Sequence, residues 1–371
     1  MKKKLLITML VASLVTGTLF AGNFSFKFGS MAQHPDYLWK ILPTYLNVGA
    51  VYDGISLIEG NETEIQFYQG LGFTQRVLYQ DKISGAPNAI GTAVENAANA
   101  TTANLFSIDS TLKIQQGFLE DDCLIANVGI KAAYERLYDE SVLSSSSVYT
   151  DLNDSSNIYN WLIGSVKYDK MVDTIFTQDG YSGEFEFTYA PSITNSTSDF
   201  YSAILDLQYA KTLYTLESAR NGRNLLSVVL IDRFSTSYTQ GDMVPTSYQS
   251  KVALGDKVRG FEGYTYNTAF NMVNNLDLRV GTFEITDYPA VILPRFNFFL
   301  DAGFAAGDYL NSDVSISAED CFLMSTGLQA TVNIGDMIDL GYQIAYLISG
   351  ENLSKDVGSS LVGSITFFLM F

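Results

Sequence analysis

The sequence predicts an all-β protein, a transmembrane antiparallel β-barrel, and three observations lead to that fold class. The chain has 371 residues, 47% of them hydrophobic, with 23 tyrosines and 24 phenylalanines. After the N-terminal segment, however, no stretch reaches the ~18 consecutive apolar residues expected of a membrane-spanning helix. Apolar residues recur instead at alternate positions, in segments of about 8 to 15 residues, long enough for tilted strands to cross a membrane. The chain also ends on an alternating segment whose last residue is Phe371.

The N-terminus is typical of an export signal. Three lysines follow Met1, an apolar stretch covers 5–20, and Ala21 is a candidate last residue before cleavage. The apolar stretch is short and contains threonine, serine and glycine, which disfavours a membrane span, although an uncleaved anchor is the alternative. We therefore expect a signal peptide over 1–21 and a barrel over 22–371 in the bacterial outer membrane.

Composition disfavours several other classes of protein. The net charge of −18 argues against nucleic-acid binding, because little positive charge is available to neutralise phosphates, and it would repel anions. Cys123 and Cys321 fall in well-separated strand candidates, so we expect two thiols, with a disulfide as the alternative. His34 is the single histidine, which disfavours a metal site. No catalytic triad, metal-ligand cluster or phosphate loop is recognisable, so we predict neither enzyme activity nor a cofactor.

Strand candidates follow one another along the chain and are separated by polar tracts. The tract over 80–103 is rich in alanine, asparagine and threonine, and the tract over 139–157 is rich in serine and aspartate. Both are predicted to be surface loops, with disordered linkers between domains as the alternative. The strand candidates in this part of the chain start near Phe24, Thr44, Thr63, Asn104, Leu124, Asn160, Ser182, Tyr201 and Asn224.

The last third of the chain alternates most regularly and predicts five strands. These strands cover 270–280, 292–303, 322–334, 340–349 and 359–371. A tight turn is expected at Gly335-Asp336, whereas the links over 305–318 and 350–358 are longer. Short turns at one end and long loops at the other are typical of outer-membrane barrels. With a periplasmic C-terminus, the long segment over 241–266 falls on the outer side.

The two faces of these strands differ in chemistry. The polar residues on the face opposite the apolar one include Asp277, Arg279, Arg295, Asn297 and Asp301. In a barrel this face is the lumen wall, because arginine or lysine in lipid at mid-depth costs about 2–4 kcal/mol. A soluble β-sandwich would show the same alternation, with the apolar face as its core, and is the alternative fold.

The C-terminal strand carries a further signal. Its apolar face includes Ile365, Phe367, Leu369 and Phe371. A last strand that ends in phenylalanine resembles the signal that outer-membrane assembly machinery recognises. We therefore expect that machinery as a partner for insertion, together with outer-membrane lipids; an ordinary amphipathic strand at a chain end is the alternative.

Two short motifs lie about forty residues apart in the C-terminal part, and together they resemble a known family. Val258-Arg259-Gly260-Phe261, in the long polar segment, resembles the VRGF/Y loop motif of the bacterial surface antigen superfamily, which includes BamA, TamA and the two-partner-secretion transporters. Leu254-Gly255-Asp256 resembles the LGG that often precedes that motif. Phe299-Leu300-Asp301-Ala302-Gly303 matches the family's FxDxG motif on the second strand after the loop. The resemblance is specific over about 225–371.

The resemblance implies a sixteen-stranded barrel, where a direct count of the strand candidates gives about fourteen to sixteen. It also implies that the long loop folds into the lumen and that Arg259 reaches Asp301 on the wall. An arginine–carboxylate pair in a narrow, partly dry lumen is bidentate and stronger than one at a surface. The candidate residues of this loop lock are Val258, Arg259, Gly260, Phe261, Asp301 and Gly303. The alternatives are a solvated loop arginine and an unrelated lumen carboxylate.

The resemblance further implies insertion of polypeptides into the outer membrane, or translocation across it, with a polypeptide client as a partner. Members with these activities usually carry periplasmic POTRA domains before the barrel. The roughly twenty residues between Ala21 and the strand candidate at Thr44 are too few for such a domain. We therefore expect a barrel-only member, and client capture does not carry over directly. A porin-like passive channel and a structural surface antigen are the alternative functions.

Overall fold

The computed structural model describes most of the predicted strands. The N-terminal export signal, His34 and Phe371 lie outside the residues it describes. The described residues are 24–32, 45–79, 100–137, 157–174, 176–192, 196, 198–219, 224–254, 257–261, 268–282, 292–310, 315–316, 321–334, 338–349 and 359–369.

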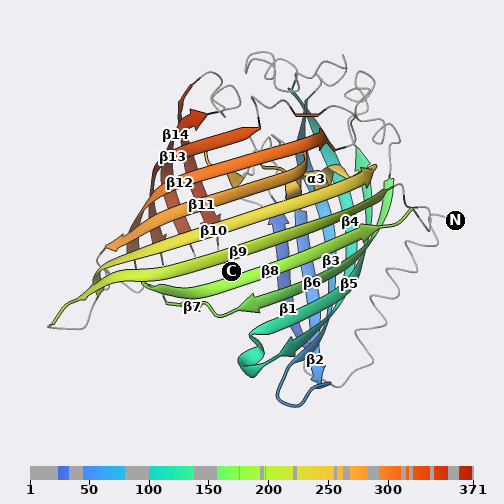
Figure 1. Cartoon of the computed structure of the whole chain (residues 1–371). Helices are drawn as coiled ribbons and strands as arrows, with labels where there is room; N and C mark the ends of the chain where they lie inside the picture. The colour runs from blue at the N-terminus through green and yellow to red at the C-terminus, as the bar shows by residue number, and fades with distance from the viewer. Residues whose placement is uncertain are drawn as a thin grey trace.

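The strands form a single antiparallel sheet of fifteen strands that curls around a central space (Figure 1). Consecutive strands pair with one another in chain order from β1 to β15, except that the short β7 pairs only with β8. The first half comprises β1 (Phe24–Ala32), β2 (Tyr45–Ile55), β3 (Thr63–Tyr79), β4 (Ala100–Phe118), β5 (Leu124–Leu137), β6 (Asn157–Asp169), β7 (Val172–Asp173) and β8 (Gln178–Ala190). The second half comprises β9 (Asp199–Glu217), β10 (Asn224–Asp242), β11 (Thr268–Thr282), β12 (Ile292–Tyr309), β13 (Phe322–Ile334), β14 (Ile338–Ser349) and β15 (Leu361–Leu369).

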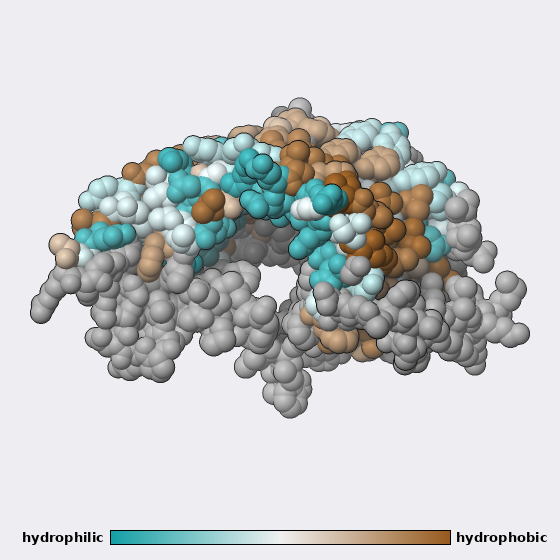
Figure 2. Space-filling model, turned by 90° about the horizontal axis from the view of Figure 1, so that it is seen from below, coloured by the Kyte–Doolittle hydropathy of each residue, from teal (hydrophilic) through white to brown (hydrophobic). Residues whose placement is uncertain are grey.

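Side-chain alternation explains why these segments form a curved sheet. On β14 the side chains of Tyr342, Ile344 and Tyr346 are exposed on the convex face, whereas Gln343 and Ala345 between them are buried. The same parity holds along the other long strands, so the apolar face points outward and the polar face points inward. Seen from below, the described residues form an arch around a hollow (Figure 2).

Links at the two ends of the strands differ in length. The short links 56–62, 119–123 and 170–177 lie at one end, and the second of them contains the 3₁₀ turn η2 (Glu120–Asp122). The link from β10 to β11 lies at the opposite end, as predicted. The prediction that a link starts at residue 305 was wrong, because β12 continues to Tyr309. Its last residues keep pairing with β11, up to Thr268 opposite Tyr309.

Strands β1 and β15 are the two ends of the sheet. Within the described ranges no backbone pairing joins them. The predicted antiparallel all-β class is confirmed, while the count of sixteen strands stays a prediction. Cys123 and Cys321 form no disulfide with each other. Among the residues that the structure describes, no helix is long and apolar enough to cross a membrane.

Candidate functional site

The link from β10 to β11 turns back into the space enclosed by the sheet. Its described residues, 243–254 and 257–261, are called the inward segment below. It contains α3 (Thr246–Val252), a helix that the sequence did not predict and that lies within the curve of the sheet (Figure 1). The helix begins after Pro245, whose carbonyl oxygen accepts the backbone N–H groups of Tyr248 and Gln249 at 2.8 and 2.9 Å. Seven residues carry too little periodicity to predict a helix.

The first anchor of the inward segment is aromatic and holds α3 on the wall formed by β6 and β9. Tyr248 packs against Trp161 with ring centroids 5.6 Å apart and an interplanar angle of 67°, and against Phe200 at 4.8 Å. All three side chains are buried. Lys251, one helical turn after Tyr248, forms an ion pair with Glu186 on β8. Contacts between tilted aromatic rings add about 0.5–1.5 kcal/mol each beyond their burial.

The second anchor is an apolar cluster on the opposite part of the wall. Leu254, Val258 and Phe261 of the inward segment are fully buried there. They meet inward-facing side chains that come one from each strand between β11 and β15. These wall residues are Val273, Ala305, Leu323, Leu347 and Val362. The segment therefore reaches across the lumen from the β6–β9 wall to the β11–β15 wall.

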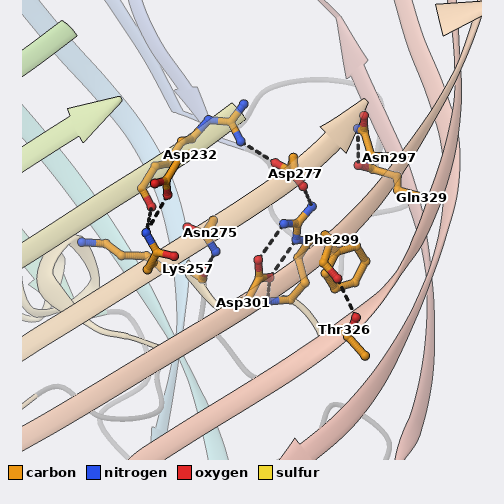
Figure 3. A network of polar contacts seen from close by, with 12 residues as sticks. Asp232, Lys257, Asn275, Asp277, Asn297, Phe299, Asp301, Thr326 and Gln329 are labelled. Atoms are coloured by element: carbon orange, nitrogen blue, oxygen red, sulfur yellow. Dashed lines mark hydrogen bonds and ion pairs between the residues drawn. The ribbon is translucent and has the colours of Figure 1, made fainter. Parts of the chain in front are cut away.

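Within the second anchor, Arg259 makes a bidentate contact with Asp301 on β12 (Figure 3). Its Nε donates to Asp301 Oδ2 at 2.7 Å and its Nη2 donates to Asp301 Oδ1 at 2.6 Å. The backbone N–H of Arg259 donates to the same Oδ2 at 3.0 Å. Asp301 is fully buried, while the Arg259 side chain keeps 20% exposure. A planar guanidinium suits this paired geometry, which a lysine would not reproduce.

A second carboxylate, Asp277 on β11, extends the contact into a network. Nη1 of Arg259 lies 2.8 Å from Asp277 Oδ1, and Nη1 of Arg233 on β10 donates to Asp277 Oδ2 at 2.6 Å. Burial opposes the charged form of Arg259, but the carboxylates of Asp301 and Asp277 more than offset it, so the pKa of Arg259 lies above its ordinary value. The guanidinium is therefore charged at every physiological pH, and the network cannot be released by its deprotonation.

An aromatic ring completes the surroundings of Arg259. The guanidinium carbon lies 3.9 Å from the centroid of the Phe299 ring, which places the cation over the ring face. Gly327 on β13 makes room for this ring, because a Cβ there would lie 2.7 Å from Phe299 Cζ. Phe299, the first residue of the FxDxG motif, thus forms a cation–π contact with Arg259, a role that the sequence alone did not assign.

The two motif glycines bring the inward segment and the wall into close contact. Gly260 has φ +97°, a conformation that disfavours other residues, and a Cβ there would lie 2.8 Å from Leu347 Cδ2. A Cβ on Gly303 would lie 2.9 Å from Val258 Cγ2 and 3.0 Å from Leu254 Cδ2. Both positions therefore favour glycine for the close approach of the segment to the wall.

Polar side chains of β11 hold the backbone of the inward segment. Asn271 donates to the carbonyl oxygen of Val252 at 3.0 Å, and Asn275 donates to that of Lys257 at 2.8 Å. Sequence reasoning missed both asparagines as functional residues. The signal that could have identified them is their position on the inward face of β11, the strand that directly follows the loop. Burial lowers the pKa of the Lys257 ammonium, which donates to Ser235 Oγ at 3.2 Å.

The remaining candidate residues lie away from the contacts between the inward segment and the wall. Arg279, Arg295 and Asn297 lie on the lumen face, further toward the short-turn end, and Asn297 donates to Gln329 at 3.3 Å. Ile365 is exposed on the convex face of β15. Phe367 and Leu369 also belong to β15, whereas Phe371 lies outside the described residues.

Comparisons with known proteins give a likeness in structure alone. No protein-family model matches the chain, and no curated protein matches it in sequence. BamA from Haemophilus ducreyi lacking POTRA domains 1–3 matches with a TM-score of 0.51 and 14% identity, over 88% of this chain and 62% of that one. CdiB from Acinetobacter baumannii and CdiB from Escherichia coli give TM-scores of 0.46 and 0.45, at 11% and 9% identity. These matches cover 88% and 87% of this chain, and 50% and 52% of the two CdiB chains.

The chain therefore spans less than two thirds of the length of each of these structures. At such low identity the BamA match is informative about the fold alone. It agrees with the curved antiparallel sheet. The fold is that of a transmembrane antiparallel β-barrel.

Proposed function

We propose that this protein is an outer-membrane barrel that inserts polypeptides into the outer membrane or moves them across it, and that the inward segment closes its lumen. The observation that carries the proposal is the fourfold contact of Arg259 with Asp301 and Asp277. Two motifs that resemble those of one transport superfamily meet there, through side chains and through the backbone. The proposal assigns the chain no catalytic role and places it in the bacterial outer membrane.

Two features of the segment favour a closing role over a loop that rests on the surface. Its contacts reach two separate parts of the wall, at Tyr248 and at Arg259, so the segment crosses the lumen and does not merely line it. Its apolar side chains are fully buried, so release of the segment would expose Leu254, Val258 and Phe261 to water. Each such side chain stabilises the closed arrangement by about 1.5–3 kcal/mol.

The ends of the sheet support a route for polypeptides into the membrane. The outer edges of β1 and β15 are not paired with each other in the described part of the chain. An unpaired edge is a template on which a new strand can form hydrogen bonds. In the proposed function a client strand pairs with one of these edges, while the inward segment keeps the lumen shut.

A passive channel for small solutes is the second candidate function. The observation in its favour is the polar character of the lumen wall, where two cavities of about 520 and 370 Å³ lie beside the inward segment. A channel of this kind needs the segment to leave a continuous water path. A structural surface antigen would need neither a path nor a client.

The test reconstitutes the protein in liposomes and measures ion conductance and the insertion of a separate test barrel. Wild type is compared with Arg259→Ala and with Arg279→Ala, which removes an arginine from the same lumen face outside the inward segment. We expect low conductance and test-barrel insertion for wild type and for Arg279→Ala, and raised conductance for Arg259→Ala. Steady conductance in wild type that Arg259→Ala leaves unchanged, with no insertion, would overturn the proposal in favour of a passive channel.

A further inference from the structure

Cations outnumber carboxylates among the residues that line the two cavities of the lumen, although the whole chain carries a net charge of −18. The first of the two cavities, of about 520 Å³, lies between the inward segment and the wall formed by β6 to β11. Two acidic residues line it, Glu184 and Asp206. The cations that line it are Lys167, Arg233, Lys257 and Arg259.

The second cavity, of about 370 Å³, lies between α3 and the wall formed by β2 to β8. Its one acidic lining residue is Glu186, and its cations are Lys113, Lys131 and Lys251. Within the described ranges Lys113 forms no ion pair. Trp161 also lines this cavity, and its buried indole N–H donates to no acceptor in the described part of the chain.

Three ion pairs of the lumen wall share one orientation. In the pair of Arg233 with Asp277, the cation is 45% exposed and the carboxylate 6%. In the pair of Lys131 with Asp109, the values are 26% and 3%. Arg259 and Asp301 differ in the same direction, at 20% and 0%. In these three pairs the carboxylate is buried more deeply than the cation with which it pairs.

We propose that the lumen attracts anions, so that the solutes or polypeptide groups that enter it preferentially are negatively charged, such as halides and carboxylates. A charge close to a cavity acts on an ion there more strongly than a charge buried behind it or spread over distant loops. The cavities therefore have a positive potential although the chain carries −18 overall. The overall charge led to the opposite expectation, that the protein repels anions. The inference applies equally to a translocating barrel and to a passive channel, so it does not rest on the proposed function.

The test uses Trp161 as a reporter inside the second cavity. The chain has two tryptophans, so Trp39→Phe leaves Trp161 as the single fluorophore. Its quenching by iodide, by caesium and by neutral acrylamide is measured at constant ionic strength in detergent-solubilised full-length protein. Each value is normalised to that of free N-acetyl-tryptophanamide in the same buffer. Lys113→Glu reverses one lining charge, and Lys170→Glu makes the same change in the exposed link after β6, as the matched control.

We expect iodide to quench Trp161 more than caesium does. Lys113→Glu should lower the iodide-to-caesium ratio by about tenfold or more. The substitution changes the charge by two units, and each unit at a few ångströms in water changes the local iodide and caesium concentrations about two- to threefold in opposite directions. Lys170→Glu should leave the ratio unchanged. Caesium quenching equal to or above iodide quenching in wild type would overturn the inference, and so would a failure of all three quenchers to reach Trp161. Neither result would bear on test-barrel insertion, so the two proposals fail separately.

Discussion

Asp301→Asn should release the inward segment from the wall without changing the shape of the side chain. Asp301 accepts three hydrogen bonds from Arg259, at 2.6, 2.7 and 3.0 Å. The asparagine amide has one acceptor oxygen, and an NH₂ donor replaces the other oxygen of the carboxylate. Because this donor faces the guanidinium, at least one hydrogen bond is lost. The guanidinium bonds that remain then have one charged partner instead of two, and a backbone N–H bond that remains has none, so each is weaker by up to about 1 kcal/mol.

The expected cost is about 2–3 kcal/mol. Breaking a fully buried ion pair costs about 3–5 kcal/mol. The estimate here is lower because Asp277 still contacts Arg259, and because the 20% exposed Arg259 side chain is partly hydrated. At 1.4 kcal/mol per factor of ten, the population with a released segment should rise about 30- to 150-fold.

Trypsin measures this population, because the inward segment contains Lys251, Lys257 and Arg259 as cleavage sites. When the segment opens and closes quickly, the cleavage rate follows the open population. Asp277→Asn is the graded control, because Asp277 makes a single contact with Arg259, and its effect should be smaller. A cleavage rate for Asp301→Asn within twofold of wild type, or below that of Asp277→Asn, would refute the reasoning.

Three further predictions concern other contacts of the inward segment. Gly303→Ala should destabilise the closed arrangement by about 1–3 kcal/mol, because its Cβ would overlap Val258, and trypsin cleavage should increase accordingly. Tyr248→Ala should remove the aromatic anchor at a cost of about 3–5 kcal/mol and should shift the emission of Trp161, measured on the Trp39→Phe background. Burial keeps the pKa of Lys257 below its ordinary 10.5. Between the lowered pKa in the closed segment and the ordinary pKa in the released segment, Lys257 binds more protons when the segment is released. Resistance to trypsin cleavage should therefore rise with pH in that range. Lys257→Met should abolish this part of the rise.

Strand positions were predictable because they depend on a period of two that is visible in the sequence. The candidates near Phe24, Thr63, Leu124 and Asn224 start where strands β1, β3, β5 and β10 begin. Errors occurred at strand ends, where hydrogen bonding continues beyond the apolar pattern. At the end of β12, for example, Gly307 adopts φ +84° and the strand still reaches Tyr309.

The inward segment was harder to predict, because its structure depends on contacts distant in sequence. The motif placed Arg259 and Asp301 in one site by resemblance, and the structure brings these two side chains together. Nothing near α3 in the sequence indicates a helix, which is held by Trp161 and Phe200 from other strands. The space that Gly303 leaves for Val258 likewise appears once the segment lies against β12.

The two anchors of the inward segment differ in physical origin, and this determines how the segment can open. The aromatic anchor at Tyr248 depends on burial, whereas the anchor at Arg259 combines burial with a buried ion pair, which salt screens weakly. They contact different strands and share no wall residue, so substitutions in each should add in their effect on the free energy of release. A client or solute that displaced α3 from the β6–β9 wall would therefore leave Arg259 bound to Asp301. We expect such a half-released segment to open the second cavity while the contacts of the VRGF motif stay in place.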